Sequence, residues 1–573
     1  MTKLFIYFRD YGKESVLGPL FKLLEATLEL FVPLVVAAII DTGIKNGDRS
    51  YIIRMCLVLV LLGIAGLVFS VTAQYYAAKA SVGFIKKLKQ KLFDHIQTFS
   101  FTQLDTIGTS TLITRMTSDM NQLQTGVNLA LRLLLRSPFV VFGAMVMAFT
   151  VDVKAALVFA AAIPVLSVVV FGIMIWCIPL YRKVQEKLDN VLGYARENLT
   201  GVRVIRAFSI EESEIKNFEE KNDELTTMQK HVGRISALMN PVTYVIINLA
   251  VIALVYTGAV RVEAGIITQG TVVALYNYMS QILVELIKLA NLIINITRSV
   301  ACGNRIQAVL DIVPDVEENH RKPETIETDI IVEFKNVYLR YKNAGDYSLS
   351  NINFKVRRGE TIGIIGGTGS GKSSLVNLIP RFYDATSGEV NIDGVNVKDY
   401  PVEELRRKIA VVPQKAVLFK GTVRDNILWG KNDASDEEIF DALTIAQAKE
   451  MVESKGGLDF EIEQGGRNLS GGQKQRLTIA RALVKKPEIL ILDDSASALD
   501  YATDAALRKS IRQMPNTPTV FVVSQRTSSI QYADNIIVLD DGQIVGIGKH
   551  DELMRSCRVY REIYDSQFKK EGA

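Results

Sequence analysis

Six long apolar stretches in the first 300 residues constrain the fold of this chain more than any other feature. Each supplies the roughly 20 residues that a helix needs to cross the hydrocarbon core of a membrane. Because lipid offers the backbone no hydrogen-bond partner, a spanning segment must satisfy its own N–H and C=O groups. The sequence therefore predicts an α-helical membrane domain of six transmembrane helices, near residues 16–42, 53–78, 130–151, 155–182, 240–262 and 271–300.

The connections between these stretches alternate between short and very long ones. The segments 79–129 and 183–239 are long, polar and helical in pattern, and each carries a basic cluster beside a span, at 86–91 and 182–187. Positive charge next to a span favours the cytoplasmic side. We therefore expect a multi-pass protein of the cytoplasmic membrane, with both long loops and both termini in the cytoplasm.

Charged residues inside the predicted spans need an explanation, since a charge at the bilayer centre costs about 2.5–3.5 kcal/mol. Residues three or four apart share one face of a helix. Two interpretations stay open: ion pairs between helices or at helix ends outside the lipid, or a polar, water-filled translocation cavity. The charged positions are Lys22, Glu25, Glu29, Arg132, Arg136, Glu285 and Lys288.

Length and composition indicate a second, soluble part of the chain. The 573 residues exceed a single core, and a charged fraction of 22% is high for a protein that lies wholly in the membrane. A net charge of +4 gives no reason to expect nucleic acid, and the four cysteines lack the spacing of a disulfide or metal framework. We predict a membrane domain at 1–310, a proline-containing linker at 311–328 and an α/β domain at 329–573.

The soluble part contains a phosphate-binding loop that fits the pattern GxxxxGK[ST]. In such loops backbone N–H groups cradle phosphates, while the lysine and the hydroxyl reach the outer phosphates and Mg²⁺. A strand pattern at 361–365 precedes the loop and a helix pattern at 373–379 follows it, which is the context that the motif requires. The predicted nucleotide ligands are Gly366, Gly367, Thr368, Gly369, Ser370, Gly371, Lys372, Ser373 and Ser374.

A second motif, LSGGQ, precedes the apolar run 489–492. Its two glycines allow backbone to approach a phosphate closely, and a helix expected to begin near Gln473 would aim N–H dipoles at that anion. In this order the two motifs resemble the nucleotide-binding domain of an ATP-binding cassette (ABC) transporter. The residues of this signature are Leu469, Ser470, Gly471, Gly472 and Gln473.

With six spans on the same chain, the resemblance extends to the type I exporter fold: a helical membrane domain fused to an α/β P-loop ATPase domain. The spans exclude a soluble ABC ATPase of repair or translation. An importer is disfavoured, because importers usually keep the two parts on separate chains. The family's coupling segments, which dock on the nucleotide domains, resemble residues 108–119 and 197–218.

The resemblance also implies roles for single residues. Tyr341 matches the aromatic side chain that stacks on adenine, although an ordinary strand tyrosine remains an alternative. The implied cofactors are ATP and Mg²⁺, the ion being held by Ser373, Gln414 and Asp493, the last directly or through water. Asp500 belongs to a loop that crosses the dimer interface in the family.

In this family a signature acts on the ATP of the opposite domain. Since this chain has one phosphate loop and one signature, it cannot complete two sites alone. The resemblance therefore implies a dimer.

Two positions depart from the active family pattern. Asp494 stands where a glutamate positions the attacking water, and Gln525 where a histidine contacts the γ-phosphate. General acid–base assistance is worth roughly 10²–10⁴-fold in rate, and glutamine cannot relay a proton. The pattern resembles the degenerate half of a heterodimeric bacterial multidrug-type exporter, in which the partner supplies the hydrolysing site. A homodimer with two slow sites and an ATP-gated channel or regulatory subunit remain alternatives.

The transported substrate is not specified by these motifs. We expect a hydrophobic or amphipathic molecule, and drug, lipid and peptide cargo all remain open.

Overall fold

A computed structural model describes residues 2–315, 328–342, 344–495 and 497–568. The chain divides into two compact units, one of residues 1–97 with 110–313 and one of residues 98–109 with 314–573. Most of the predicted linker, residues 316–327, lies outside the described residues. The two units are described separately.

The first unit is helical, and six of its helical segments are long and apolar enough to cross a membrane: Lys3–Ile44, Arg49–Gln97, Thr109–Val151, Val153–Thr200, Glu211–Glu263 and Gln269–Leu310. Each predicted apolar stretch lies inside one of them, so the prediction of six spans is confirmed. The elements are α1 (Gly12–Ala38), α2 (Arg49–Gln97), α4 (Thr109–Thr114), α5 (Met120–Leu133), α6 (Arg136–Val151), α7 (Val153–Thr200), α8 (Val202–Ala207), α9 (Glu211–Ala237), α10 (Met239–Glu263) and α11 (Gln269–Leu310), with short 3₁₀ or π turns at Thr2–Tyr11, Ile39–Ile44 and Arg115–Asp119.

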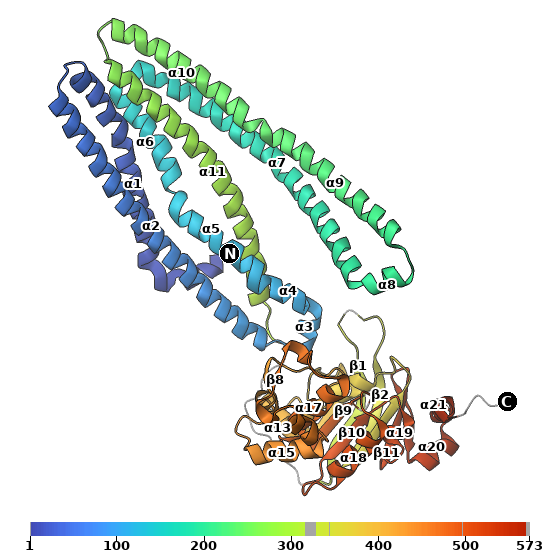
Figure 1. Ribbon diagram of the computed structural model, residues 1–573. Coiled ribbons are helices and arrows are strands. Elements are labelled where there is room, and N and C mark those ends of the chain that lie inside the picture. Colours follow the sequence, from blue (N-terminus) through green and yellow to red (C-terminus); the bar gives the residue numbers. More distant parts are fainter. Residues whose placement is uncertain (1, 316–327, 343, 496, 569–573) are drawn as a thin grey trace. The chain divides into compact units, whose positions relative to one another are not determined.

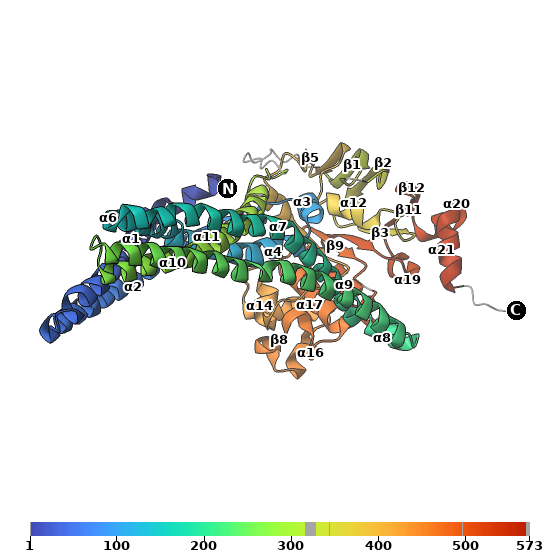
Figure 2. The ribbon, with the colours of Figure 1, turned by 90° about the horizontal axis from the view of Figure 1, so that it is seen from above.

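The helices of this unit extend well beyond the thickness of a bilayer. They run 42 to 53 residues, which at 1.5 Å per residue is about 60–80 Å, against about 30 Å of hydrocarbon. The long polar loops are therefore continuations of the spans: α2 continues unbroken to Gln97, and α7 and α9 run side by side to a tip that contains α8 (Figures 1 and 2).

The second unit is built on a six-stranded sheet with the strand order β12-β11-β3-β10-β9-β6, in which only β12 runs antiparallel to its neighbour. An antiparallel sheet of order β2-β1-β4-β5 and a two-stranded β7-β8 ribbon complete it. Central strands such as β9 read as continuous apolar runs because helices cover both faces of a parallel sheet. The strands are β1 (Ile330–Leu339), β2 (Leu349–Arg357), β3 (Thr361–Gly366), β4 (Ser387–Ile392), β5 (Val395–Asn396), β6 (Ile409–Val412), β7 (Gly421–Thr422), β8 (Glu461–Ile462), β9 (Ile489–Asp493), β10 (Thr519–Val523), β11 (Asn535–Asp540) and β12 (Gln543–Gly548).

The helices of the second unit pack against these sheets. In Figure 2, strands β1, β2 and β5 lie at one edge of this unit, and helices α14, α16 and α17 lie at the opposite edge. The first helix, α3, comes from residues far from the others in sequence and begins with a capping box between Ser100 and Gln103. The helices are α3 (Phe101–Ile107), α12 (Lys372–Leu378), α13 (Val402–Lys408), α14 (Val423–Leu428), α15 (Asp436–Ile445), α16 (Lys449–Ser454), α17 (Gly471–Leu483), α18 (Tyr501–Arg512), α19 (Thr527–Ile530), α20 (His550–Ser556) and α21 (Arg558–Phe568).

Candidate nucleotide site

The phosphate loop joins the buried strand β3 to helix α12, as the motif predicts. Gly371 has a φ of +92°, and a Cβ there would lie 2.7 Å from the Ser348 carbonyl oxygen, so only glycine fits. Lys372 folds back over the loop, and its Nζ donates to the carbonyl oxygens of Gly366 at 2.9 Å and Gly367 at 2.6 Å. The loop thus encloses a buried ammonium group at the helix N-terminus, which suits a phosphate.

Burial lowers the pKa of Lys372, because desolvation disfavours its charged form. An anion beside Nζ would favour the charged form and offset that cost. The predicted phosphate-loop residues from Thr368 to Ser374 line one cavity of about 270 Å³. This geometry and charge fit the phosphates of a nucleotide.

The residues proposed to hold Mg²⁺ converge at the same cavity. Ser373 Oγ donates to Asp493 Oδ1 at 3.1 Å, and Gln414 Nε2 donates to Asp494 Oδ2 at 3.3 Å. Burial raises the pKa of Asp493, and the charge of neighbouring Asp494 adds to the effect. A divalent cation would offset both the burial and the repulsion between the two carboxylates, and hydroxyl, carboxylate and amide oxygens are the ligands that Mg²⁺ accepts. The donor set therefore fits the ion.

The two departures from the family pattern lie at this cavity as well. Asp494 follows β9 with a φ of +47°, and its N–H donates to the carbonyl oxygen of Val523 at 2.9 Å. Asp494 and Gln525 line the cavity together with Lys372 and Ser373. The fold thus brings the two substituted positions to the place where the chemistry of a bound nucleotide would occur.

Tyr341 lies at the edge of the phosphate loop rather than in the cavity lining. Its hydroxyl is 2.9 Å from Ser374 Oγ, and its ring stands perpendicular to that of Tyr383, with 5.1 Å between centroids. Burial raises the pKa of Tyr341, so it stays neutral. The half-buried ring is held beside the phosphate loop.

Tyr383 was not singled out from the sequence, and it connects this site to α3. Its hydroxyl donates to Asp105 Oδ2 at 2.6 Å, and the neighbouring Phe382 ring lies 4.5 Å from Phe101. The segment that packs within the second unit is 98–109. It overlaps only the first two residues of the predicted coupling segment 108–119, whose role stays a prediction. The S-x-x-Q capping pattern that begins at Ser100 was the sequence signal that could have identified this helix.

We expect Tyr383→Phe to loosen α3 without weakening nucleotide binding. The substitution keeps the ring against Tyr341 but removes a hydrogen bond to a carboxylate, a loss of roughly 1.5–3 kcal/mol. Hydrogen–deuterium exchange of the full chain should show amides of 101–107 exchanging about tenfold faster or more. Tyr347→Phe is the matched control, since among the described residues no hydrogen bond of its hydroxyl is found. Equal exchange in both variants would contradict the role of the Tyr383 hydroxyl.

The signature lies at the start of α17, which begins two residues earlier than predicted, at Gly471 rather than near Gln473. Ser470 is the N-cap, and its side chain and that of Gln473 form a capping box. Leu469 is buried in the core, while a Cβ on Gly471 would meet nothing within 4 Å. Among the described residues no hydrogen-bond partner is found for the N–H groups of Gly471 and Gly472, and the helix face at Gly471 is open.

Asp500, the predicted interface residue, caps α18 by accepting from the Thr503 N–H at 2.9 Å. That backbone hydrogen bond holds the pKa of Asp500 below its usual range. The preceding loop approaches the signature helix, since a Cβ on Gly472 would lie 3.0 Å from the Ala498 carbonyl oxygen. Interface loop and signature are thus neighbours within one domain.

In the membrane unit, both interpretations of the intramembrane charges find support. Arg136 donates to Glu29 and to Glu285 at 2.6 Å each, and Lys288 donates to Glu285 at 2.9 Å. A further pair joins Lys22 and Glu25 at 2.5 Å. Glu29, Arg136, Glu285 and Lys288 also line a cavity of about 450 Å³ between α1, α6 and α11. Arg132 belongs to none of the ion pairs found among the described residues.

Comparison with known proteins agrees with this architecture. Residues 15–286 match the ABC transporter transmembrane region, and residues 349–497 match the ABC transporter domain. The chain is 36% identical to "Uncharacterized ABC transporter ATP-binding protein YfiB" of Bacillus subtilis over 100% of both chains. It is 32% identical to "Putative multidrug export ATP-binding/permease protein YgaD" of the same organism, over 99% of both.

Among solved structures, a bacterial Atm1-family ABC exporter with ATP bound has the same fold. The TM-score is 0.82 at 23% identity, over 98% of this chain and 99% of that one. One membrane region and one ATPase domain on a single chain are the composition of a half-transporter. The chain therefore belongs to the ABC transporter family and has the fold of an ABC exporter half-transporter.

Proposed function

We propose that this chain is the ATP-binding and permease subunit of a heterodimeric ABC exporter, in which its own phosphate loop forms the low-activity ATP site. One observation carries the proposal: the phosphate-loop residues 368–374 and the proposed Mg²⁺ ligands line one cavity, together with Asp494 and Gln525 in place of the hydrolytic pair. A binding site that keeps ATP while a second site hydrolyses it explains this combination.

Lys372 and the backbone of the phosphate loop would hold the phosphates, and Tyr341 would stack on the adenine. Ser373, Gln414 and Asp493 would hold Mg²⁺, which neutralises charge on the outer phosphates when bound. Asp494 is one methylene shorter than glutamate, and a displacement of about 1 Å in a catalytic group can cost on the order of 10²-fold in rate. Gln525 donates a hydrogen bond but carries no charge. The site would thus bind ATP and cleave it slowly.

A partner subunit is supported by where the signature lies. The cavity lining in the described chain includes none of the residues 469–473, so the open first turn of α17 is available to another chain's nucleotide. The tip between α7 and α9 also carries exposed apolar side chains among charged ones. Leu199 is 77% exposed, Val204 58% and Phe208 73%. Such a patch outside the spans suits contact with a second subunit.

We place the ATPase unit, both termini and the α7–α9 tip in the cytoplasm. The reason is that the basic clusters at 86–91 and 182–187 lie where the spans continue into the long polar loops, and positive charge beside a span favours the cytoplasmic side. The substrate would be hydrophobic or amphipathic. The cavity between α1, α6 and α11 supports this choice, since it combines apolar residues such as Val140 and Val284 with charged ones. The relative YgaD, named as a putative multidrug export protein, supports the same choice.

Co-expression with a candidate partner half-transporter that carries the glutamate and histidine at the matching positions tests the proposal. We expect vigorous vanadate-sensitive ATPase and substrate efflux in the pair, and little ATPase in this chain alone. Equal turnover by this chain alone would favour a homodimer with two slow sites. Nucleotide binding by the pair without steady turnover would favour an ATP-gated channel or regulatory subunit, which the residues at 494 and 525 also allow.

We expect Lys372→Ala to empty this chain's own site while sparing the partner's. The lysine supplies charge to the outer phosphates that no nearby group replaces. Nucleotide occupancy of the heterodimer should fall from two to about one, and transport should slow while a fraction of the ATPase remains. Lys420→Ala, an exposed lysine outside the phosphate cavity, is the control. An occupancy that stays at two would show that Lys372 is not a phosphate ligand.

A further inference from the structure

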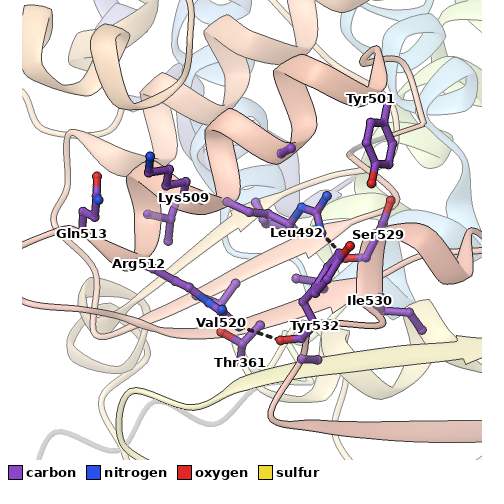
Figure 3. Close-up of a pocket in the computed structure, with 15 residues that line it drawn as sticks. Thr361, Leu492, Tyr501, Lys509, Arg512, Gln513, Val520, Ser529, Ile530 and Tyr532 are labelled. Atoms are coloured by element: carbon purple, nitrogen blue, oxygen red, sulfur yellow. Dashed lines mark hydrogen bonds between the residues drawn. The ribbon is translucent and has the colours of Figure 1, made fainter. Parts of the chain in front are cut away.

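A second cavity in the ATPase unit, of about 400 Å³, lies between α18 and the core sheet and is closed by α19 and the residues after it (Figure 3). Its floor is apolar and comes from the sheet and α19: Leu492, Val520, Val522 and Ile530. Tyr501 and Tyr532 stand at its rim and are more than half exposed. The volume is within the range of about 300–1,000 Å³ that small-molecule sites occupy.

The charged groups that line this cavity are all cationic: Arg508, Lys509 and Arg512. Arg508 is balanced by Asp504, 3.2 Å away, whose carboxylate is buried and also accepts from Ser529 Oγ at 3.3 Å. Within the described part of the chain, Arg512 donates to a single acceptor, the Tyr532 carbonyl oxygen, at 2.6 Å. In the described chain no acceptor is found for Lys509.

Acidic groups near the cavity do not offset these cations. Asp504 is occupied by Arg508 and Ser529, and the carboxylate of Asp534 accepts from the backbone N–H of Thr361 at 2.8 Å. Two cations, Lys509 and Arg512, therefore stand at the mouth of an apolar cavity, and neither has a carboxylate partner among the residues that the structure describes. An apolar interior with an uncompensated positive mouth is complementary to an amphipathic anion.

We propose that this cavity binds a small amphipathic anion, with an apolar or aromatic body and a single carboxylate, sulfonate or phosphate group, and that the bound anion regulates ATP turnover. The apolar body would lie on the floor of Leu492, Val520 and Val522. The anionic group would lie between Lys509 and Arg512. Binding needs only this chain, whereas the effect on turnover rests on the proposed heterodimer.

The walls of the cavity continue directly into the segments that carry the nucleotide-site residues. Leu492 immediately precedes Asp493, and Val522 lies on the strand that leads to Gln525. Helix α18 starts directly after the interface loop 497–500, and the guanidinium of Arg526 donates to the Ser497 carbonyl oxygen at 3.3 Å. A molecule wedged between α18 and the sheet would therefore restrain the interface loop.

Binding can be measured by calorimetry on the full chain in lipid nanodiscs, with empty nanodiscs subtracted. The probe is naphthalene-2-sulfonate, and we expect a Kd below about 1 mM. Naphthalene-2-methanol has the same body without the charge, and methanesulfonate has the charge without the body. Both should bind at least about tenfold more weakly. No heat from the sulfonate at about 10 mM, or equal affinity for the uncharged analogue, would overturn the proposal.

Two variants locate the site. Ala505→Trp fills the cavity from α18, and Lys509→Glu reverses one charge without changing the apolar floor. Each variant should lower the affinity for naphthalene-2-sulfonate at least about tenfold while leaving ATP binding at the phosphate loop unchanged. Lys420→Glu, a matched charge reversal outside the cavity, should leave the affinity for the sulfonate unchanged. Unaltered affinity in Lys509→Glu would overturn the assignment even if Ala505→Trp folded poorly.

The regulatory half is tested in the heterodimer. Saturating sulfonate should change the ATPase rate at least about twofold and should slow hydrogen exchange of the backbone amides in 497–512. In the Lys509→Glu heterodimer, the same concentration should change neither the rate nor the exchange. Binding without any change in rate or exchange would overturn regulation and leave the binding site standing. If the heterodimer shows no ATPase activity even without the probe, while this chain still binds the probe, the result would count against the proposed function and not against the binding site.

Discussion

Ser470→Arg should abolish hydrolysis by the heterodimer almost completely. Ser470 caps α17, and the following turn presents backbone N–H groups on an open face. In the proposed dimer this turn faces the outer phosphates of the nucleotide held by the partner. Arginine adds bulk where backbone must approach closely, so hydrolysis should fall on the order of 10²-fold or more. Steady-state ATPase of the purified pair is the measurement.

Two comparisons separate this effect from simple loss of a helix cap. Ser435→Arg removes an equivalent capping box at α15, and it should lower stability by about 1 kcal/mol with hydrolysis largely kept. Lys372→Ala acts on this chain's own site, and a fraction of the ATPase should remain. If Ser470→Arg proves milder than Lys372→Ala, the competent site does not use this signature and the assignment of halves is wrong.

Asp494→Glu together with Gln525→His should raise hydrolysis at this chain's own phosphate loop by about tenfold or more. The groups that would bind the phosphates and Mg²⁺, residues 368–374, Gln414 and Asp493, already line the cavity, and the two substituted positions lie among them. Lengthening the carboxylate and restoring an imidazole supplies the two groups that the family pattern has at these places. Single-turnover hydrolysis, with the partner's catalytic glutamate disabled, measures the gain.

The single substitutions serve as controls, since each restores only one of two groups that act on the same reaction. A smaller gain in each of them than in the double variant would fit the proposal. No gain above the disabled background, with ATP still bound, would show that the partner's signature limits the site instead of Asp494 and Gln525.

Prediction from sequence succeeded for features that are determined by residues close together in the chain. A stretch of about 20 apolar residues in lipid has few options besides a helix, and all six stretches lie in long helices. The strand–loop–helix around Lys372 was equally predictable, because glycines at positive φ and a helix N-terminus are encoded in neighbouring residues. The start of α17 was misplaced because the capping box of Ser470 and Gln473 was read as part of the phosphate-binding turn.

By itself, then, the sequence determined the six spans, the phosphate loop and the two departures at 494 and 525. Only the tertiary structure decided that α3 packs within the ATPase unit, since the bond between Tyr383 and Asp105 joins residues 278 positions apart. It also decided that the charges of α1, α6 and α11 pair around a cavity, and that α18 leaves a cationic cavity against the sheet. Local patterns specify backbone conformation, whereas pairing and voids arise when distant side chains are packed together, and no short window of sequence contains both partners.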